Sequence, residues 1–234
     1  MLFPIGDDNS ARTRTPYINY CLIAINIFVF IYYQGIGSND SFTLSFSTVP
    51  QEIITGQDNV SRGLGVTPIP VYLTLLTSMF MHGGLMHIIG NMMYLWIFGD
   101  NLENRMGHIK YLGFYLLCGL IASLSHVFVS AAVGKDLFIP SLGASGAISG
   151  VLGGYLLLFP KNQVRVFALV TVLRIPAFVS LGLWIGLQIW DGYNDLSITS
   201  GGGVAYAAHI GGFIAGLLLV RSFSKEVLPV GQYK

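Results

Sequence analysis

Long apolar runs, each closed by charged or turn-forming residues, dominate the sequence. Runs of this kind are typical of helices that cross a ~30 Å hydrocarbon core, which takes about 20 apolar residues. We predict six membrane spans, at residues 17–34, 84–99, 110–133, 145–159, 175–190 and 204–220. The predicted fold class is therefore an all-α polytopic membrane protein, a bundle of six transmembrane helices.

The segments between the spans predict orientation and domain plan. With a cytoplasmic N-terminus, ten of the 12 Lys and Arg residues lie on the inside and two on the outside. This bias places both termini inside. The plan is then a cytoplasmic segment 1–16, a membrane domain 17–222 and a cytoplasmic tail 223–234. The long first outside loop, 35–80, is expected to hold short helices in the membrane interface. Segment 160–175 is expected to be an interfacial turn or amphipathic helix.

Composition agrees with a membrane protein and excludes other classes. The chain is 53% hydrophobic and 10% charged, whereas soluble domains are about 25% charged. A formal net charge of +1 gives no electrostatic basis for binding nucleic acid. The two cysteines, Cys21 and Cys118, lie inside apolar runs and predict neither a disulfide framework nor a metal site.

Four polar residues inside the spans are candidates for chemistry, because polar groups in a membrane are costly without a function or a partner. They are His87 and Asn91 in the second span, Ser145 at the start of the fourth and His209 in the sixth. These three spans run in the same direction. At ~1.5 Å per residue, His87, Ser145 and His209 are therefore expected at similar depth in the outer third of the membrane, with Asn91 one turn deeper than His87. His87 and Asn91, spaced i and i+4, share one helix face.

Glycine spacing predicts that the fourth and sixth spans pack closely. Glycines recur every four residues in both spans: Gly146, Gly150 and Gly154 in the fourth, and Gly212 and Gly216 in the sixth. Such stripes let helix backbones approach each other. Contact between them would bring Ser145 within reach of His209, whose neutral imidazole could take the serine proton.

Acyl transfer also needs hydrogen-bond donors for the developing oxyanion. The backbone around Gly143 and Ser145 enters a helix, where amide groups lack partners. The side chains of His87 and Asn91 could add donors. Because the spans carry no acidic residue at this level, we predict a Ser–His dyad without a carboxylate.

Other interpretations of the same residues remain open. Ser145 alone would be a helix N-cap, and an isolated intramembrane histidine is often structural. A metal site could be imagined from His82, His87 and His209, but no Asp, Glu or Cys accompanies them. A transporter would need polar residues across the whole membrane, and the inner halves of the fourth and sixth spans are apolar. A catalytically silent binding protein would typically lack the serine or the histidine.

Four segments together resemble the rhomboid intramembrane serine proteases: HGGLMHIIGN at 82–91, ENR at 103–105, GASG at 143–146 and AHIGG at 208–212. The resemblance implies the following roles: Ser145 as nucleophile, His209 as general base, His87 and Asn91 with the Ser145 amide as oxyanion hole, and Glu103 and Arg105 as a charged motif that braces the first loop's supporting helices. The family often has an aromatic residue four positions after the serine, stacked on the histidine. That position is Ser149 here, so His209 is expected to be held differently, for example by a neighbouring span.

The resemblance also implies substrates and location. Single-span membrane proteins would be cut at or near the outer membrane face, entering from the lipid beside the fifth span. No metal, nucleotide or other cofactor is expected. The compact six-span form suggests a prokaryotic plasma membrane.

Overall fold

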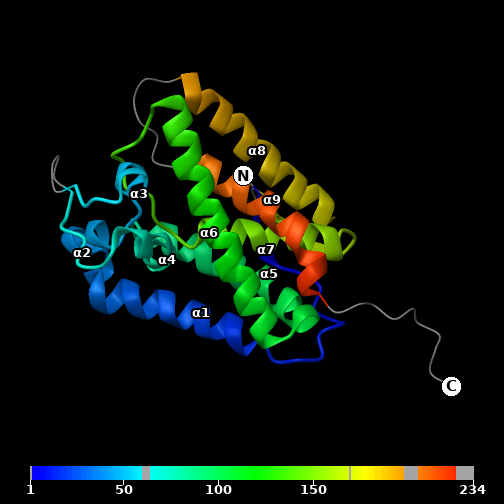
Figure 1. Ribbon diagram of the computed structural model, residues 1–234. Helices are drawn as coiled ribbons and strands as arrows, with labels where there is room; N and C mark the ends of the chain where they lie inside the picture. Colours follow the sequence, from blue (N-terminus) through cyan, green and yellow to red (C-terminus); the bar gives the residue numbers. More distant parts are fainter. Residues whose placement is uncertain (1, 60–63, 169, 198–204, 225–234) are drawn as a thin grey trace.

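A computed structural model describes residues 2–59, 64–168, 170–197 and 205–224. Six helices of 12 or more residues form a bundle within these ranges (Figure 1): α1 (Tyr17–Phe28), α5 (Leu85–Met106), α6 (His108–Val133), α7 (Ser145–Leu158), α8 (Ala177–Ser197) and α9 (Tyr206–Phe223). A π-helical turn, η1 (Val29–Tyr33), extends α1. The predicted tail 223–234 is described only as far as Ser224, and the remainder lies outside the described residues.

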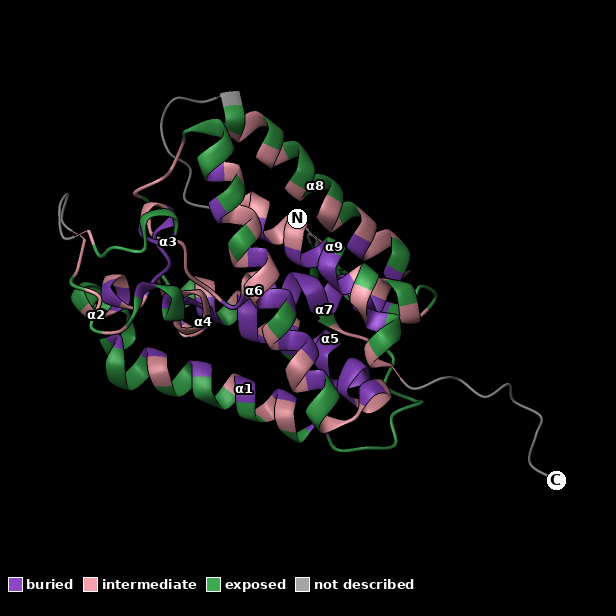
Figure 2. Cartoon of the chain, in the orientation of Figure 1, coloured by how far each residue is buried: buried purple, intermediate pink, exposed green. Residues whose placement is uncertain are grey.

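Helix α7 lies inside the bundle, in contact with α5, α6 and α9 (Figure 2). Every residue from Ala147 to Tyr155 is buried. This helix is small or apolar on all sides, which is the pattern of a helix surrounded by protein. In contrast, α1, α6 and α8 expose large apolar side chains along one face, as helices in contact with lipid would.

Two helices among the described residues, α6 and α9, are long and apolar enough to cross a membrane by length and composition. The segment 71–80 and α5 would count as a third span if taken together, although they are bent by 79° at the break between them. The helices Tyr17–Tyr33 and Ser145–Leu158 are apolar but shorter. The bundle is thus mostly helical and compatible with a membrane, while six spans remain a prediction.

Helices α7 and α9 approach at their glycines. A methyl group added at Gly212 would overlap the carbonyl oxygen of Gly146, and one added at Gly216 would overlap that of Gly150. Gly154 faces side chains instead of backbone, and an added methyl would meet Leu102, Phe114 and Val220 at 3.1 Å, closer than ordinary van der Waals contact. Backbone contact of this kind sets the distance between the first turns of the two helices. We call this end of the bundle the serine end; it holds the first residues of α5, α7 and α9.

Helix α5 extends beyond residue 99, the predicted end of the second span, and continues to Met106. The extra turns carry polar side chains that are nonetheless buried: Asp100, Asn101 and Glu103. Each finds a partner among residues 7–19. Glu103 accepts hydrogen bonds from the backbone amides of Ile18 (2.9 Å) and Asn19 (2.7 Å). Its carboxylate thereby caps the first turn of α1, where the helix dipole favours negative charge.

The expectation of an all-α protein is confirmed only in part: the described chain is mostly helical, but it also contains strands. Strands β1 (Leu2–Gly6), β2 (Gln163–Ala168) and β3 (Thr171–Pro176) form an antiparallel sheet in the order β1-β2-β3. Segment 160–175 is therefore neither an interfacial turn nor a helix. Val164 and Val166 alternate with exposed residues and pack into the core, which is the two-residue period of a strand with one covered face.

Among its described residues, the long segment 35–80 holds a 3-10 turn η2 (Gly35–Gly37) followed by the short helices α2 (Asp40–Ser45), α3 (Pro50–Thr55), η4 (Val71–Leu73), α4 (Thr74–Thr77) and η5 (Ser78–Phe80). It packs beside the serine end and is held there by backbone and side-chain hydrogen bonds. Thr48 and Ser141 exchange amide–carbonyl hydrogen bonds of 3.0 and 2.7 Å. The Gln34 side chain bonds both the amide and the carbonyl of His82, at 3.0 and 2.8 Å.

A buried carboxylate joins the N-terminal segment to the bundle. Asp7 accepts hydrogen bonds from the Tyr155 hydroxyl (2.6 Å) and the Asn101 amide (2.8 Å), while its second oxygen is buried without a partner among the described residues. Burial, together with the nearby Asp100 carboxylate, raises the pKa of Asp7 from 3.8 to about 6, and the two hydrogen bonds only partly oppose this.

This shift predicts how stability depends on pH. In the unfolded chain Asp7 loses its proton near its ordinary pKa, whereas the folded protein holds the proton to about pH 6. The stabilisation is full below the unfolded pKa of 3.8 and is lost as pH rises to the folded pKa of about 6, at a cost of about 3 kcal/mol. We expect the unfolding temperature in detergent to fall as the pH rises from about 4 to about 6, and to level off above that. The Asp7→Asn variant should show a flatter profile; an equally steep one would assign the pH dependence to another group.

Candidate active site

Ser145 and His209 meet at the serine end, across the glycine contact. Ser145 is the first residue of α7, and His209 lies in the first turns of α9. His209 Nε2 is 2.8 Å from Ser145 Oγ. A serine hydroxyl hydrogen-bonded to a histidine nitrogen is the arrangement that activates a nucleophile. The bond length is that of an ordinary hydrogen bond.

His209 has a second partner that the sequence analysis missed. The Oε1 atom of Gln188, from α8, lies 2.6 Å from His209 Nδ1. An amide oxygen can only accept, so Nδ1 carries the proton and Nε2 is left to accept from Ser145. Trp184, one turn before Gln188, lies with its ring 6.0 Å from the His209 ring. A single amide in the fifth apolar run was the signal that could have identified Gln188.

His87 and Asn91 lie on one face of α5, opposite the serine. The Gly83 amide donates to His87 Nδ1 at 3.2 Å, so the neutral ring has its proton on Nε2. That atom faces Gly143: a methyl group there would be 2.8 Å from Nε2 and 3.6 Å from Asn91 Nδ2. The Asn91 Nδ2 group is buried and has no hydrogen-bond partner among the described residues. Both side chains therefore present donors to the same space.

Gly143 does not serve as the oxyanion donor that the sequence suggested. Its amide donates to the Ser78 carbonyl at 2.9 Å and is used there. Its φ of +124° is a conformation that side chains rarely adopt, and the absent side chain leaves room for His87. The Ser145 amide is in the first turn of α7, where helix geometry supplies no carbonyl partner.

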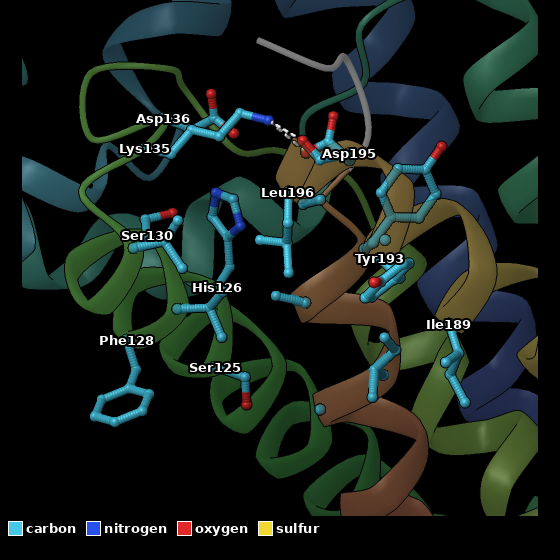
Figure 3. Close-up of a pocket in the computed structure, with 18 of the residues that line it drawn as sticks. Ser125, His126, Phe128, Ser130, Lys135, Asp136, Ile189, Tyr193, Asp195 and Leu196 are labelled. Carbon is cyan, nitrogen blue, oxygen red and sulfur yellow. Dashed lines mark hydrogen bonds and ion pairs between the residues drawn. The ribbon is translucent and has the colours of Figure 1, made fainter. Parts of the chain in front are cut away.

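A cavity of about 540 Å³ contains all of these groups. Its wall includes Ser145, His209, His87, Asn91 and Gln188, and also Trp184, Tyr94 and Met86. A larger cavity of about 700 Å³ lies between α6, α8 and α9 and does not include Ser145 (Figure 3). His126 is in this second cavity, below an ion pair of Lys135 with Asp195 at 3.0 Å.

The remaining predicted residues lie outside the cavity that holds Ser145. His82 is fully buried behind His87, with the two rings 5.2 Å apart. Glu103 and Arg105 are at the other end of α5, where Glu103 caps α1 and Arg105 occupies the last turn. Among the described residues, no group of three His, Cys, Asp or Glu side chains is arranged to hold a metal ion.

Comparison with known proteins finds a matching family model and several related proteins. Residues 70–226 match the family model described as the Rhomboid domain. "Rhomboid protein 1, mitochondrial" of Saccharomyces cerevisiae is 27% identical over 217 residues, 92% of this chain and 56% of that protein. "RHOMBOID-like protein 4" of Arabidopsis thaliana is 28% identical, covering 89% of this chain and 52% of the relative. The human "Presenilin-associated rhomboid-like protein, mitochondrial" is 29% identical over 62% of this chain and 36% of its own length.

These relatives correct one expectation and confirm another. The prediction of a prokaryotic plasma membrane is contradicted, because the three relatives are eukaryotic and two are named mitochondrial. The compact six-span form therefore does not indicate which membrane contains the protein. The chain spans about half the length of the first two relatives. The resemblance drawn from four motifs is confirmed by a family match over more than half of the sequence: the chain belongs to the rhomboid family.

Proposed function

We propose that this protein is an intramembrane serine endopeptidase that cleaves single-span membrane proteins through Ser145 and His209. The observation that carries the proposal is the 2.8 Å bond between His209 Nε2 and Ser145 Oγ, inside a cavity with unused donors opposite the serine. Because two of the relatives are named mitochondrial, we place the proposed activity in a mitochondrial membrane.

The chemistry follows from the positions of the atoms. Ser145 Oγ attacks the carbonyl carbon of the scissile bond while His209 Nε2 takes the hydroxyl proton. The carbonyl oxygen gains negative charge and accepts from His87 Nε2–H, Asn91 Nδ2–H and the Ser145 amide. His209 then protonates the leaving amine as the C–N bond breaks. Water, deprotonated by His209, hydrolyses the acyl-enzyme and restores the serine.

Substrates are proposed to enter sideways from the lipid between α5 and α8. Helix α8 covers the cavity with Trp184 and Gln188 and otherwise exposes apolar side chains such as Leu187 and Ile189. A helix with this exposed apolar face suits contact with lipid and with a substrate helix. A cross-link between α5 and α8 should therefore prevent cleavage of membrane-embedded substrates; unchanged cleavage would exclude this route.

The alternative within the family is an inactive relative that only binds membrane proteins. A fluorophosphonate probe separates the two, because it phosphonylates an activated serine and ignores an ordinary one. We expect the purified protein in detergent to be labelled at Ser145, identified by mass spectrometry, and His209→Ala not to be labelled. Cleavage of a generic single-span substrate should persist in the presence of chelators. Substrate capture without labelling or cleavage would favour the binding protein.

Replacement of Asn91 by alanine should lower kcat about 10²-fold, the usual effect of one oxyanion donor among several. KM should change little, since the bond forms in the transition state. The control is Ile89→Ala, on the exposed side of the same helix. Complete loss of activity in a folded Asn91→Ala protein, or no loss, would each contradict the assigned role.

A further inference from the structure

Helix α8 holds the His209 ring with two side chains spaced one turn apart. Gln188 Oε1 lies 2.6 Å from Nδ1, and the Trp184 ring lies 6.0 Å from the imidazole. Residues at i and i+4 share a helix face, so both contacts come from the side of α8 that faces α9. In this chain Ser149 occupies the position after the serine that an aromatic residue would need, and its hydroxyl donates to the Ser145 carbonyl at 2.6 Å.

The bond to Gln188 determines which nitrogen of His209 can act as base. Without a fixed acceptor at Nδ1, a neutral histidine distributes its proton between two nitrogens, and only one tautomer can take the serine proton. An acceptor at Nδ1 selects that tautomer and fixes the ring plane, which is the task of the third residue in serine and cysteine protease triads.

A neutral hydrogen-bond acceptor at His209 Nδ1 also suits the apolar surroundings of the ring. An ionised carboxylate beside His209 would be buried among apolar side chains, where its charge is costly unless His209 carries a proton and pairs with it. Gln188 is partly buried, while its neighbours Leu187 and Ile189 are exposed. Between Leu181 and Trp190, Gln188 is the single amide side chain of α8; it lines the cavity, and its amide oxygen is hydrogen-bonded to His209.

We propose that Gln188 is a positioning residue that completes a Ser145–His209–Gln188 triad with a neutral third member. This inference rests on the proposed protease function. It replaces the expected dyad by three residues from three helices, α7, α9 and α8. Gln188 does not touch the substrate's reacting atoms; it acts through the orientation of His209.

The test compares the wild type with Gln188→Met, which keeps length without an acceptor, and Gln188→Glu, which keeps the acceptor and adds charge. Gln188→Met should lower kcat about 10²-fold, the low end of a general base's contribution, because the base itself remains. KM should stay within about twofold. Gln188→Glu should recover most of kcat, with the acid limb of the kcat/KM profile moved about one pH unit upward, because a carboxylate favours protonated His209. Ile189→Met, exposed on the same helix, is the control.

The outcomes distinguish this inference from the proposed function. If the wild type cleaves and Ser145→Ala does not, while both Gln188 variants keep wild-type kcat and pH profile, the triad is overturned and the protease stands. Gln188→Glu could instead be as slow as Gln188→Met, with an unmoved acid limb of the kcat/KM profile. Gln188 would then only hold α8 against α9, and the triad would also be overturned. If the wild type does not cleave, the protease and the triad both fall. Unfolding temperatures of all variants in detergent exclude loss of fold.

Discussion

Replacement of Ser145 by alanine is expected to lower kcat/KM by about 10⁴-fold or more, because no covalent intermediate can then form. The Ser145 hydroxyl oxygen forms the bond to the substrate carbonyl carbon. Without this hydroxyl, His209 has no proton to accept. The side chain is small and stands at the start of α7, so the fold should persist. Cleavage of a single-span substrate by purified protein in detergent, followed on gels, measures the change.

Ser149→Ala is the matched control for this variant. Ser149 is another serine of α7, one turn further on, buried, with its hydroxyl bonded to the Ser145 carbonyl. Its loss should leave cleavage within a few-fold. The double variant Ser145→Ala with His209→Ala should be no slower than Ser145→Ala alone, since residues that act as a unit are not additive. Equal cleavage by the wild type and Ser145→Ala would reveal a contaminant or another nucleophile.

Gly216→Ala is expected to destabilise the bundle by about 3 kcal/mol. This is the upper end of the usual cost of adding a carbon atom to a packed core. The added methyl group would overlap the Gly150 carbonyl oxygen. Backbone atoms cannot rotate away as a side chain does, so α7 and α9 must separate. Because Ser145 and His209 sit on these two helices, cleavage should fall together with the unfolding temperature.

The control for Gly216→Ala is Gly186→Ala on α8, where an added methyl group meets no atom within 4 Å. In that position alanine should be neutral or stabilise by up to about 1 kcal/mol through its helix propensity. The comparison is made by thermal unfolding in one detergent. A Gly216→Ala protein as stable as the wild type would mean that the two helices pack less closely than the structure shows.

The sequence by itself determined what depends on local pattern. Apolar runs mark the long helices, because each run must satisfy its own backbone hydrogen bonds in a membrane. Four-residue spacing predicts the glycine contact, and position along parallel spans predicts that Ser145, His209 and His87 share a depth, with Asn91 one turn deeper. These four side chains line one cavity in the folded chain. The motifs that they belong to also led to the family.

Only the tertiary structure decided what depends on partners distant in sequence. Strand β1 pairs with β2 about 160 residues later, and the sequence of neither strand indicates which strand it pairs with. The polar end of α5 continues as helix because the N-terminal segment supplies Arg12 to Asp100 and amides to Glu103. Gln188 reaches His209 because α8 packs on α9. Periodicity specifies which face of a helix is apolar, but the hydrogen-bond partners of its polar side chains are set by which helices pack side by side.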